Sequence, residues 1–206
     1  MRKATKTVAM WLGIIAGLAG LEHGYFEFLQ GNVPPPSLVF PSMGPPCIPE
    51  HVWNACEPAL TVLPSLRVAG ILTMLLCLLI ILWSAFFIQS KYGGGVLILL
   101  SALLLPAGGG VFPPIIGLVG GLAGTHINKP ISREPGRAPR LAAILWPWPL
   151  VIFMVWVLGQ WVIGYFFNDF LKSIMGFGLL LILSMLPLSV YCAYAHDVVQ
   201  SIQERD

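Results

Sequence analysis

The chain has 206 residues, of which 57% are hydrophobic and only 10% are charged, and its formal net charge is +2. Soluble domains carry about 25% charged residues, so this composition excludes a solvated surface around an ordinary core. The small net charge, without a basic run interleaved with aromatic residues, also argues against a nucleic-acid partner. Repeated apolar runs of about 20 residues instead predict an all-α polytopic protein in a lipid bilayer. We expect residues 1–206 to form a single transmembrane domain.

The first predicted element is a transmembrane helix over about residues 8–29. Its glycines recur at helical spacing and form one stripe, which is typical of a face that packs closely on another helix; they are Gly13, Gly17, Gly20 and Gly24. The same helix carries Glu22, His23 and Glu27, and Gln30 follows its predicted end. Ionisable side chains are costly in lipid and usually face protein or water. This helix is therefore where we expect function.

Residues 31–66 are predicted to form a linker. The linker holds nine of the 18 prolines, a density that rules out a continuous helix and favours extended segments. It also contains Cys47 and Cys56. If the linker lies outside the cell, its surroundings are oxidising, which predicts a disulfide between these cysteines. A pair of free or redox-active thiols is the alternative.

A second helix is predicted over about residues 68–88, and an irregular region follows at residues 96–127. Two short apolar arms there flank Gly108, Gly109 and Gly110 together with nearby prolines, and no helix can continue through such a sequence. Either the arms cross the membrane twice, which gives about six transmembrane helices, or they form a re-entrant hairpin beside four. The glycines make either a plain turn or a ligand site of the discontinuous-helix kind.

The remaining elements are a helix over about residues 141–166, a short loop that includes Lys172, and a helix over about residues 174–194. Nine of the 11 lysines and arginines fall on one side of the membrane if the irregular region re-enters or crosses twice. Because loops rich in these residues stay in the cytoplasm, both termini are predicted to be cytoplasmic and the 31–66 linker external. We expect a plasma membrane of prokaryotic type.

The depth of the polar residues predicts where a site lies. At 1.5 Å per residue, His23 lies about 25 Å and Glu27 about 31 Å beyond Lys6, and Gln160 lies about 30 Å beyond Arg140. These groups therefore reach the outer leaflet. The prediction is an outward-facing polar pocket between the first and fifth helices, covered by the linker. Its candidate ligand- or ion-binding residues are Glu22, His23, Glu27, Gln30 and Gln160. The alternative is that these groups make interfacial or structural hydrogen bonds and bind nothing.

Three classes of function remain open. The pocket and the broken region favour an ion- or solute-binding transporter or channel-like protein. The small size and the lack of a catalytic constellation favour a non-catalytic accessory or scaffold subunit, in a homo-oligomer or with a membrane partner. The third class is an intramembrane enzyme that depends on a metal or on thiols. His23 and Glu27 share the i, i+4 spacing of metal ligands, but two ligands make an incomplete site, and the sequence identifies no cofactor.

Overall fold

The computed structural model describes residues 1–43, 57–130 and 137–203, and the chain is mostly helical, as predicted. Within these residues, four helices are long and apolar enough to cross a membrane. They are α1 (Lys3–Gln30), α2 (Leu66–Leu82) with a π-helical turn at Trp83–Phe87, α6 (Trp148–Phe166) and α7 (Asn168–Gln203). The apolar helices α3 (Gly93–Ala107) and α4 (Phe112–Gly124) are shorter. Six full-length spans are therefore not confirmed.

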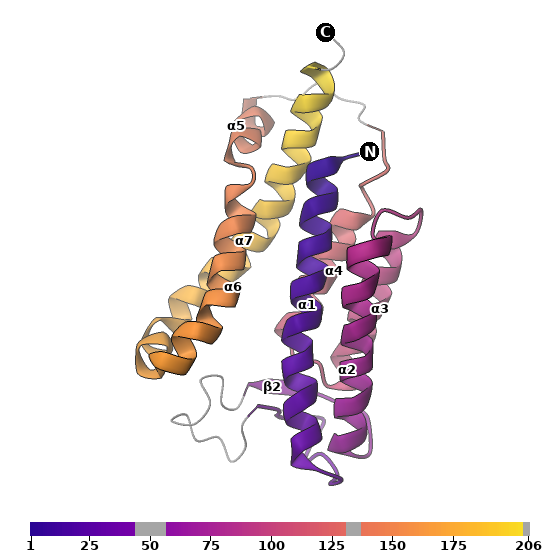
Figure 1. Ribbon diagram of the computed structural model, residues 1–206, viewed down its shortest axis with the longest axis vertical. Coiled ribbons are helices and arrows are strands. Elements are labelled where there is room, and N and C mark those ends of the chain that lie inside the picture. Colours follow the sequence, from indigo (N-terminus) through magenta and orange to yellow (C-terminus); the bar gives the residue numbers. More distant parts are fainter. Residues whose placement is uncertain (44–56, 131–136, 204–206) are drawn as a thin grey trace.

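The glycine stripe of α1 packs against α2, as its spacing predicts. A side chain added at Gly17 would overlap Ile81, and one added at Gly24 would meet the backbone of Gly70. Because neither glycine has a side chain, the two helix backbones approach closely. Figure 1 shows α1 and α2 running side by side along most of their length.

Helices α3 and α4 form a hairpin whose turn is the predicted glycine break. Gly108 and Gly110 have φ angles of 121° and 76°, in the region that glycine adopts without steric cost. The carbonyl oxygen of Ala107 accepts hydrogen bonds from the hydroxyls of Thr61, at 3.3 Å, and Thr73, at 3.0 Å. These bonds satisfy a carbonyl group at the point where the helix is broken.

The linker is partly extended, as predicted, and it forms a small antiparallel sheet. Strand β1 (Val39–Pro41) pairs with β2 (Pro58–Leu60), and the buried side chains of Phe40 and Ala59 lie at partner positions. The predicted disulfide falls outside the described residues, because neither Cys47 nor Cys56 belongs to them.

The predicted fifth helix is in fact two helices, α5 (Arg137–Leu145) and α6. Proline lacks the backbone N–H that a helix needs, and Pro147 separates the two. The loop expected around Lys172 is instead the first part of α7, since only Phe167 separates α6 from α7.

Helix α7 also continues past its predicted end at Tyr194, because its last turns pack against the start of α1. The Asp197 carboxylate accepts hydrogen bonds from the backbone N–H groups of Ala4, at 2.9 Å, and Thr5, at 2.7 Å. The Thr5 hydroxyl donates a third bond, also at 2.7 Å. Asp197 thus caps the N-terminus of a helix distant in sequence, where a negative charge is favourable.

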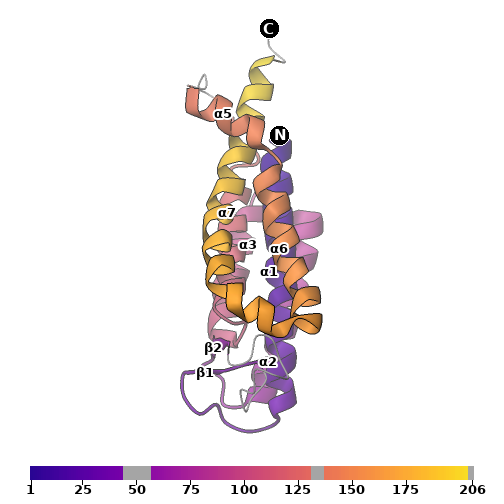
Figure 2. The same ribbon diagram turned by 90° about the vertical axis from the view of Figure 1, so that its left-hand side faces the viewer.

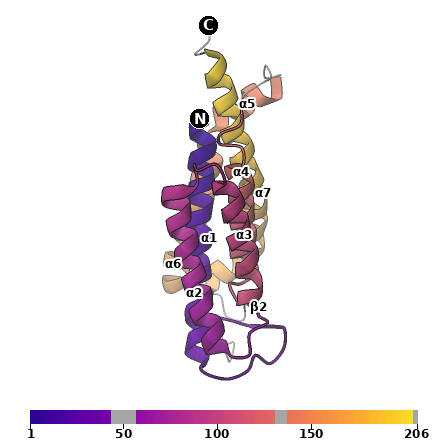
Figure 3. The same cartoon turned by 90° about the vertical axis from the view of Figure 1, so that its right-hand side faces the viewer.

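The N-terminus lies at one end of the molecule, together with α5 and the end of α7, and the small sheet lies at the opposite end (Figure 1). Helices α6 and α7 form a pair beside the other helices (Figure 2), and α1, α2 and α3 form a bundle (Figure 3). The pair leans away from α1 toward the end that carries the sheet.

Candidate functional site

A cavity of about 360 Å³ lies between α1, the start of α4, α6 and α7, and we call it the cleft. Its walls are largely apolar and include Phe112, Ile116, Val157 and Leu179. Polar side chains line the rest of it: Glu22, His23, Glu57, Gln160, Trp161 and Lys172. This volume is within the range of small-molecule sites, which are mostly apolar with a few convergent polar groups.

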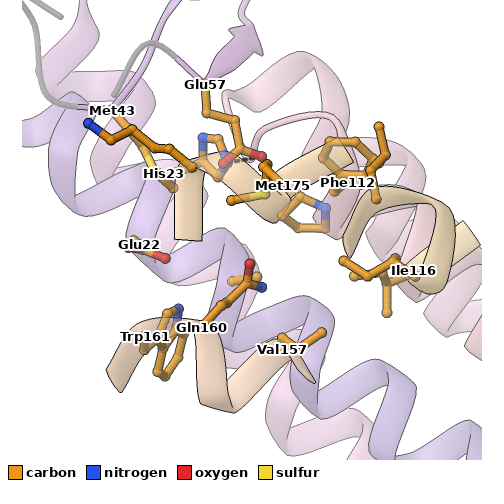
Figure 4. A pocket seen from close by; sticks show the side chains of 15 residues that line it. Glu22, His23, Met43, Glu57, Phe112, Ile116, Val157, Gln160, Trp161 and Met175 are labelled. Carbon is orange, nitrogen blue, oxygen red and sulfur yellow. Dashed lines mark ion pairs between the residues drawn. The ribbon is translucent and has the colours of Figure 1, made fainter. Parts of the chain in front are cut away.

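Three titratable groups meet in the cleft near the linker (Figure 4). Glu22 and His23 are neighbours on α1, and Glu57 precedes strand β2. His23 Nε2 lies 3.7 Å from Glu57 Oε1, which makes an ion pair when the imidazole is protonated. The Glu22 carboxyl interacts electrostatically with both neighbours, and the indole N–H of Trp161 points toward it.

The His23 ring is held between the glycine break and the cleft. Its side chain is only 1% exposed, and a Cβ added at Gly110 would overlap the ring. Glycine at this position therefore gives the imidazole its space. In the described part of the chain, His23 Nδ1 has no hydrogen-bond partner. A buried ring nitrogen without a partner is unusual and is a feature of sites that receive a ligand or water.

Glu27 is fully buried but does not line the cleft. Its Oε1 accepts a hydrogen bond from the Ser42 hydroxyl at 3.2 Å, and its carboxyl packs against Gly108. Gln30 also contacts the linker, because its side-chain amide donates to the carbonyl oxygen of Ser42 at 2.8 Å. Glu27 and Gln30 therefore join α1 to the linker.

The five candidate residues thus fall into two groups. Glu22, His23 and Gln160 converge on the cleft, whereas Glu27 and Gln30 do not line it. The glycines of the break do not line it either, but Gly108 packs against Glu27 and Gly110 packs against His23. Phe112, just beyond them, forms part of the wall.

The same division separates His23 from Glu27, the pair with metal-ligand spacing. His23 faces Glu57, and Glu27 faces Ser42. Within the described residues, no group of three or more His, Cys, Asp and Glu side chains is placed to hold a metal ion.

Several residues of the cleft, Glu57 among them, were not among the sequence candidates. Lys172 was assigned to a loop, and only its place in the first turns of α7 directs it to the cleft. Trp161 follows the candidate Gln160, so its position beside a predicted site residue was the available signal. Met43 carries no chemical signal in the sequence, and it lines the cleft because the linker folds back onto α1.

No protein-family model, curated protein or solved structure matches this chain. The functional argument therefore rests on the geometry of the cleft.

Proposed function

We propose that this chain is an integral membrane protein that binds a small amphipathic solute in the cleft. The observation that carries the proposal is the division of the cleft into apolar walls and one polar region formed by Glu22, His23 and Glu57. A molecule with a polar head and a short apolar body matches this division. A purely structural gap would have no need for two carboxyls and an imidazole, which are costly at membrane depth.

We further propose that the chain crosses the membrane four times and that α3 and α4 form a re-entrant hairpin. With 15 and 13 residues, these helices are about 22 Å and 20 Å long, shorter than the roughly 30 Å of a hydrocarbon core. The Arg2 backbone N–H bonds to the carbonyl of Ile127 at 3.0 Å, which supports a common side for the N-terminus and the end of the hairpin. The lysine and arginine distribution makes that side cytoplasmic, so the cleft faces outward.

Binding is better supported than passage through the membrane. Toward the chain termini, the helices beside the cleft are filled by apolar side chains, and those of Val8, Leu12 and Ile15 are almost completely buried. A solute in the cleft therefore meets close-packed side chains in that direction, and transport would require the helices to separate. An accessory subunit without a ligand is the competing function, and the following experiment separates the two.

The test uses calorimetry to measure the binding of three probes with a hexyl chain to the protein in lipid nanodiscs. The probes are hexyltrimethylammonium, hexanol and hexyl sulfate, which share a body and differ in charge. We expect at least one of them to bind. The variant Ala19→Trp places a bulky side chain in the cleft, so it should weaken that binding about tenfold or more.

The matched control is Leu75→Trp, which adds the same side chain to a lipid-facing position of α2 that is 54% exposed. This variant should bind the probe like the unmodified protein. The proposal fails if no probe binds, or if Ala19→Trp binds as tightly as the control while keeping the same thermal unfolding midpoint. Either result would favour the accessory-subunit function.

A further inference from the structure

We infer that the solute recognised by the cleft is an organic cation that carries an ammonium group on an apolar body. This inference rests on the proposed binding function and names the chemical class of the ligand. It follows from the charges that face the cleft, from the polar and aromatic side chains beside them and from the apolar walls.

Among the residues that the structure describes, the carboxylates at the polar region of the cleft outnumber the cations. Glu22 and Glu57 supply two carboxylates, and the cationic candidates are His23 and Lys172. The Lys172 ammonium lies 3.1 Å from the exposed carboxylate of Asp169, so a third carboxylate shares its charge. A protonated His23 balances Glu57 across their 3.7 Å contact and leaves Glu22 unbalanced, whereas a neutral His23 leaves both carboxylates unbalanced. In either state, an ionised Glu22 has no positive partner of its own among these side chains.

The missing positive charge strongly affects which ligands the cleft attracts, because of where the carboxylates lie. Glu22 is half-buried and interacts with Glu57 as one negative charge with another. Apolar walls lower the local dielectric constant, which strengthens both the repulsion and the attraction for an entering cation. A cation between the two carboxylates removes the repulsion and adds two attractions. Both carboxylates would instead repel an anion.

The neighbouring side chains favour an organic cation over a hydrated metal ion. The Trp161 indole borders the carboxyl of Glu22, and an indole face attracts ammonium groups. The Gln160 amide, which also lines the cleft, supplies hydrogen-bonding atoms. The walls formed by Ile116, Val157 and Leu179 have no role in binding a bare ion, but they accommodate an alkyl or aryl body.

The probe panel also tests this inference. In nanodiscs, hexyltrimethylammonium should bind about tenfold more tightly than hexanol, and hexyl sulfate should bind more weakly than either. The variants Glu22→Gln and Glu57→Gln should each weaken binding of the cation about fivefold and leave hexanol unchanged. Lys172→Gln removes a positive charge from the cleft and should strengthen binding of the cation. A purely structural role of these residues would alter all probes alike.

The matched control is Glu27→Gln, the same substitution on the same helix at a residue outside the cleft. It should bind hexyltrimethylammonium like the unmodified protein. The inference is overturned if hexanol or hexyl sulfate binds as tightly as the cation and Ala19→Trp abolishes that binding, a result that leaves the proposed function intact. Loss of binding for all three probes overturns the proposed function itself.

An ammonium group can come from a free amine or from a lipid headgroup, and the lipid of the nanodisc separates these sources. If the natural occupant is a lipid headgroup, hexyltrimethylammonium binds more weakly in phosphatidylethanolamine nanodiscs than in nanodiscs of an uncharged digalactosyl lipid, whose headgroup has no ammonium group. If it is a free amine, the probe binds equally in the two lipids when no competitor is added, and hexylamine displaces it in both. Failure of hexylamine to displace the probe in either lipid contradicts ammonium recognition.

Discussion

At the level of single residues, Glu27 has the least exposed titratable side chain of α1. It is 0% exposed, yet one oxygen accepts a hydrogen bond from Ser42 and the other has no partner in the described residues. A buried carboxyl with one hydrogen bond is far cheaper as a neutral group than as an anion. We therefore interpret Glu27 as a neutral contact between α1, the linker and the glycine break.

This interpretation predicts different effects for two substitutions of Glu27. Glu27→Gln keeps the shape and the acceptor for Ser42, so the unfolding midpoint in detergent should change little. Glu27→Ala leaves the Ser42 hydroxyl without its acceptor and opens a cavity, and it should cost about 2–4 kcal/mol. Thermal unfolding followed by circular dichroism measures both. An equal loss in the two variants would show that the negative charge itself is required.

The glycine break makes a second prediction at this scale. Ala at position 108 would have to adopt a φ of 121°, and its Cβ would overlap the Glu27 carboxyl. We expect Gly108→Ala to destabilise the protein by at least about 2 kcal/mol. Gly95→Ala is the control, because nothing lies within 4 Å of the added Cβ. In a helix this change should be neutral or slightly stabilising. Equal midpoints for the two variants would contradict the described turn.

Among the helices, the end of α7 contacts the start of α1, and this contact joins the α6–α7 pair to the rest of the molecule. Asp197 accepts three hydrogen bonds from two residues of α1 and is 6% exposed. Arg2 adds a second contact, since its guanidinium stacks on Tyr194 with 4.5 Å to the ring centroid. The α6–α7 pair is therefore joined to α1 at the end of the molecule opposite to the linker.

Asp197→Ala should remove the three hydrogen bonds that join α7 to α1. Two backbone N–H groups and one hydroxyl lose their acceptor, so we expect a loss of about 2–3 kcal/mol. Asp169→Ala, at the other end of α7, removes a carboxylate that is 98% exposed and should cost only a small fraction of that. Thermal unfolding in the same detergent compares them. The capping role is contradicted if both variants unfold at the same temperature.

For the whole molecule, the proposed orientation can be measured with a membrane-impermeant maleimide. Cys47 and Cys56 are first replaced by serine, and the remaining cysteines, Cys77 and Cys192, are buried. In intact cells Val62→Cys, which is 69% exposed in the linker, should react. Tyr92→Cys, at the opposite end and also 69% exposed, should react only after the membrane is opened. Reaction of both variants in intact cells would exclude the re-entrant hairpin with this orientation.

The sequence predicts the apolar helices well, because each follows from composition and periodicity within one segment. It also predicts that Glu22, His23 and Gln160 reach a common depth, since depth depends only on the rise per residue. It does not predict that Glu27 lies outside the cleft that His23 lines. Helical periodicity tells which residues share a face of α1, but the neighbours of that face depend on where the linker and the α3–α4 hairpin pack. Lys172 was assigned to the wrong element for a similar reason, because the turn between α6 and α7 is a single residue.

The contact between Asp197 and α1 affects the cleft through the tilt of α7. Helix α7 is continuous from Met175, which lines the cleft, to Asp197, and this distance is about 33 Å along the helix axis. At this distance, a tilt of α7 by roughly 5° about its contact with α1 would move Met175 by about 3 Å. Pro187 lies between the two points and removes one hydrogen bond of the helix. The width of the cleft therefore depends in part on the angle between α7 and α1 at their contact near Asp197.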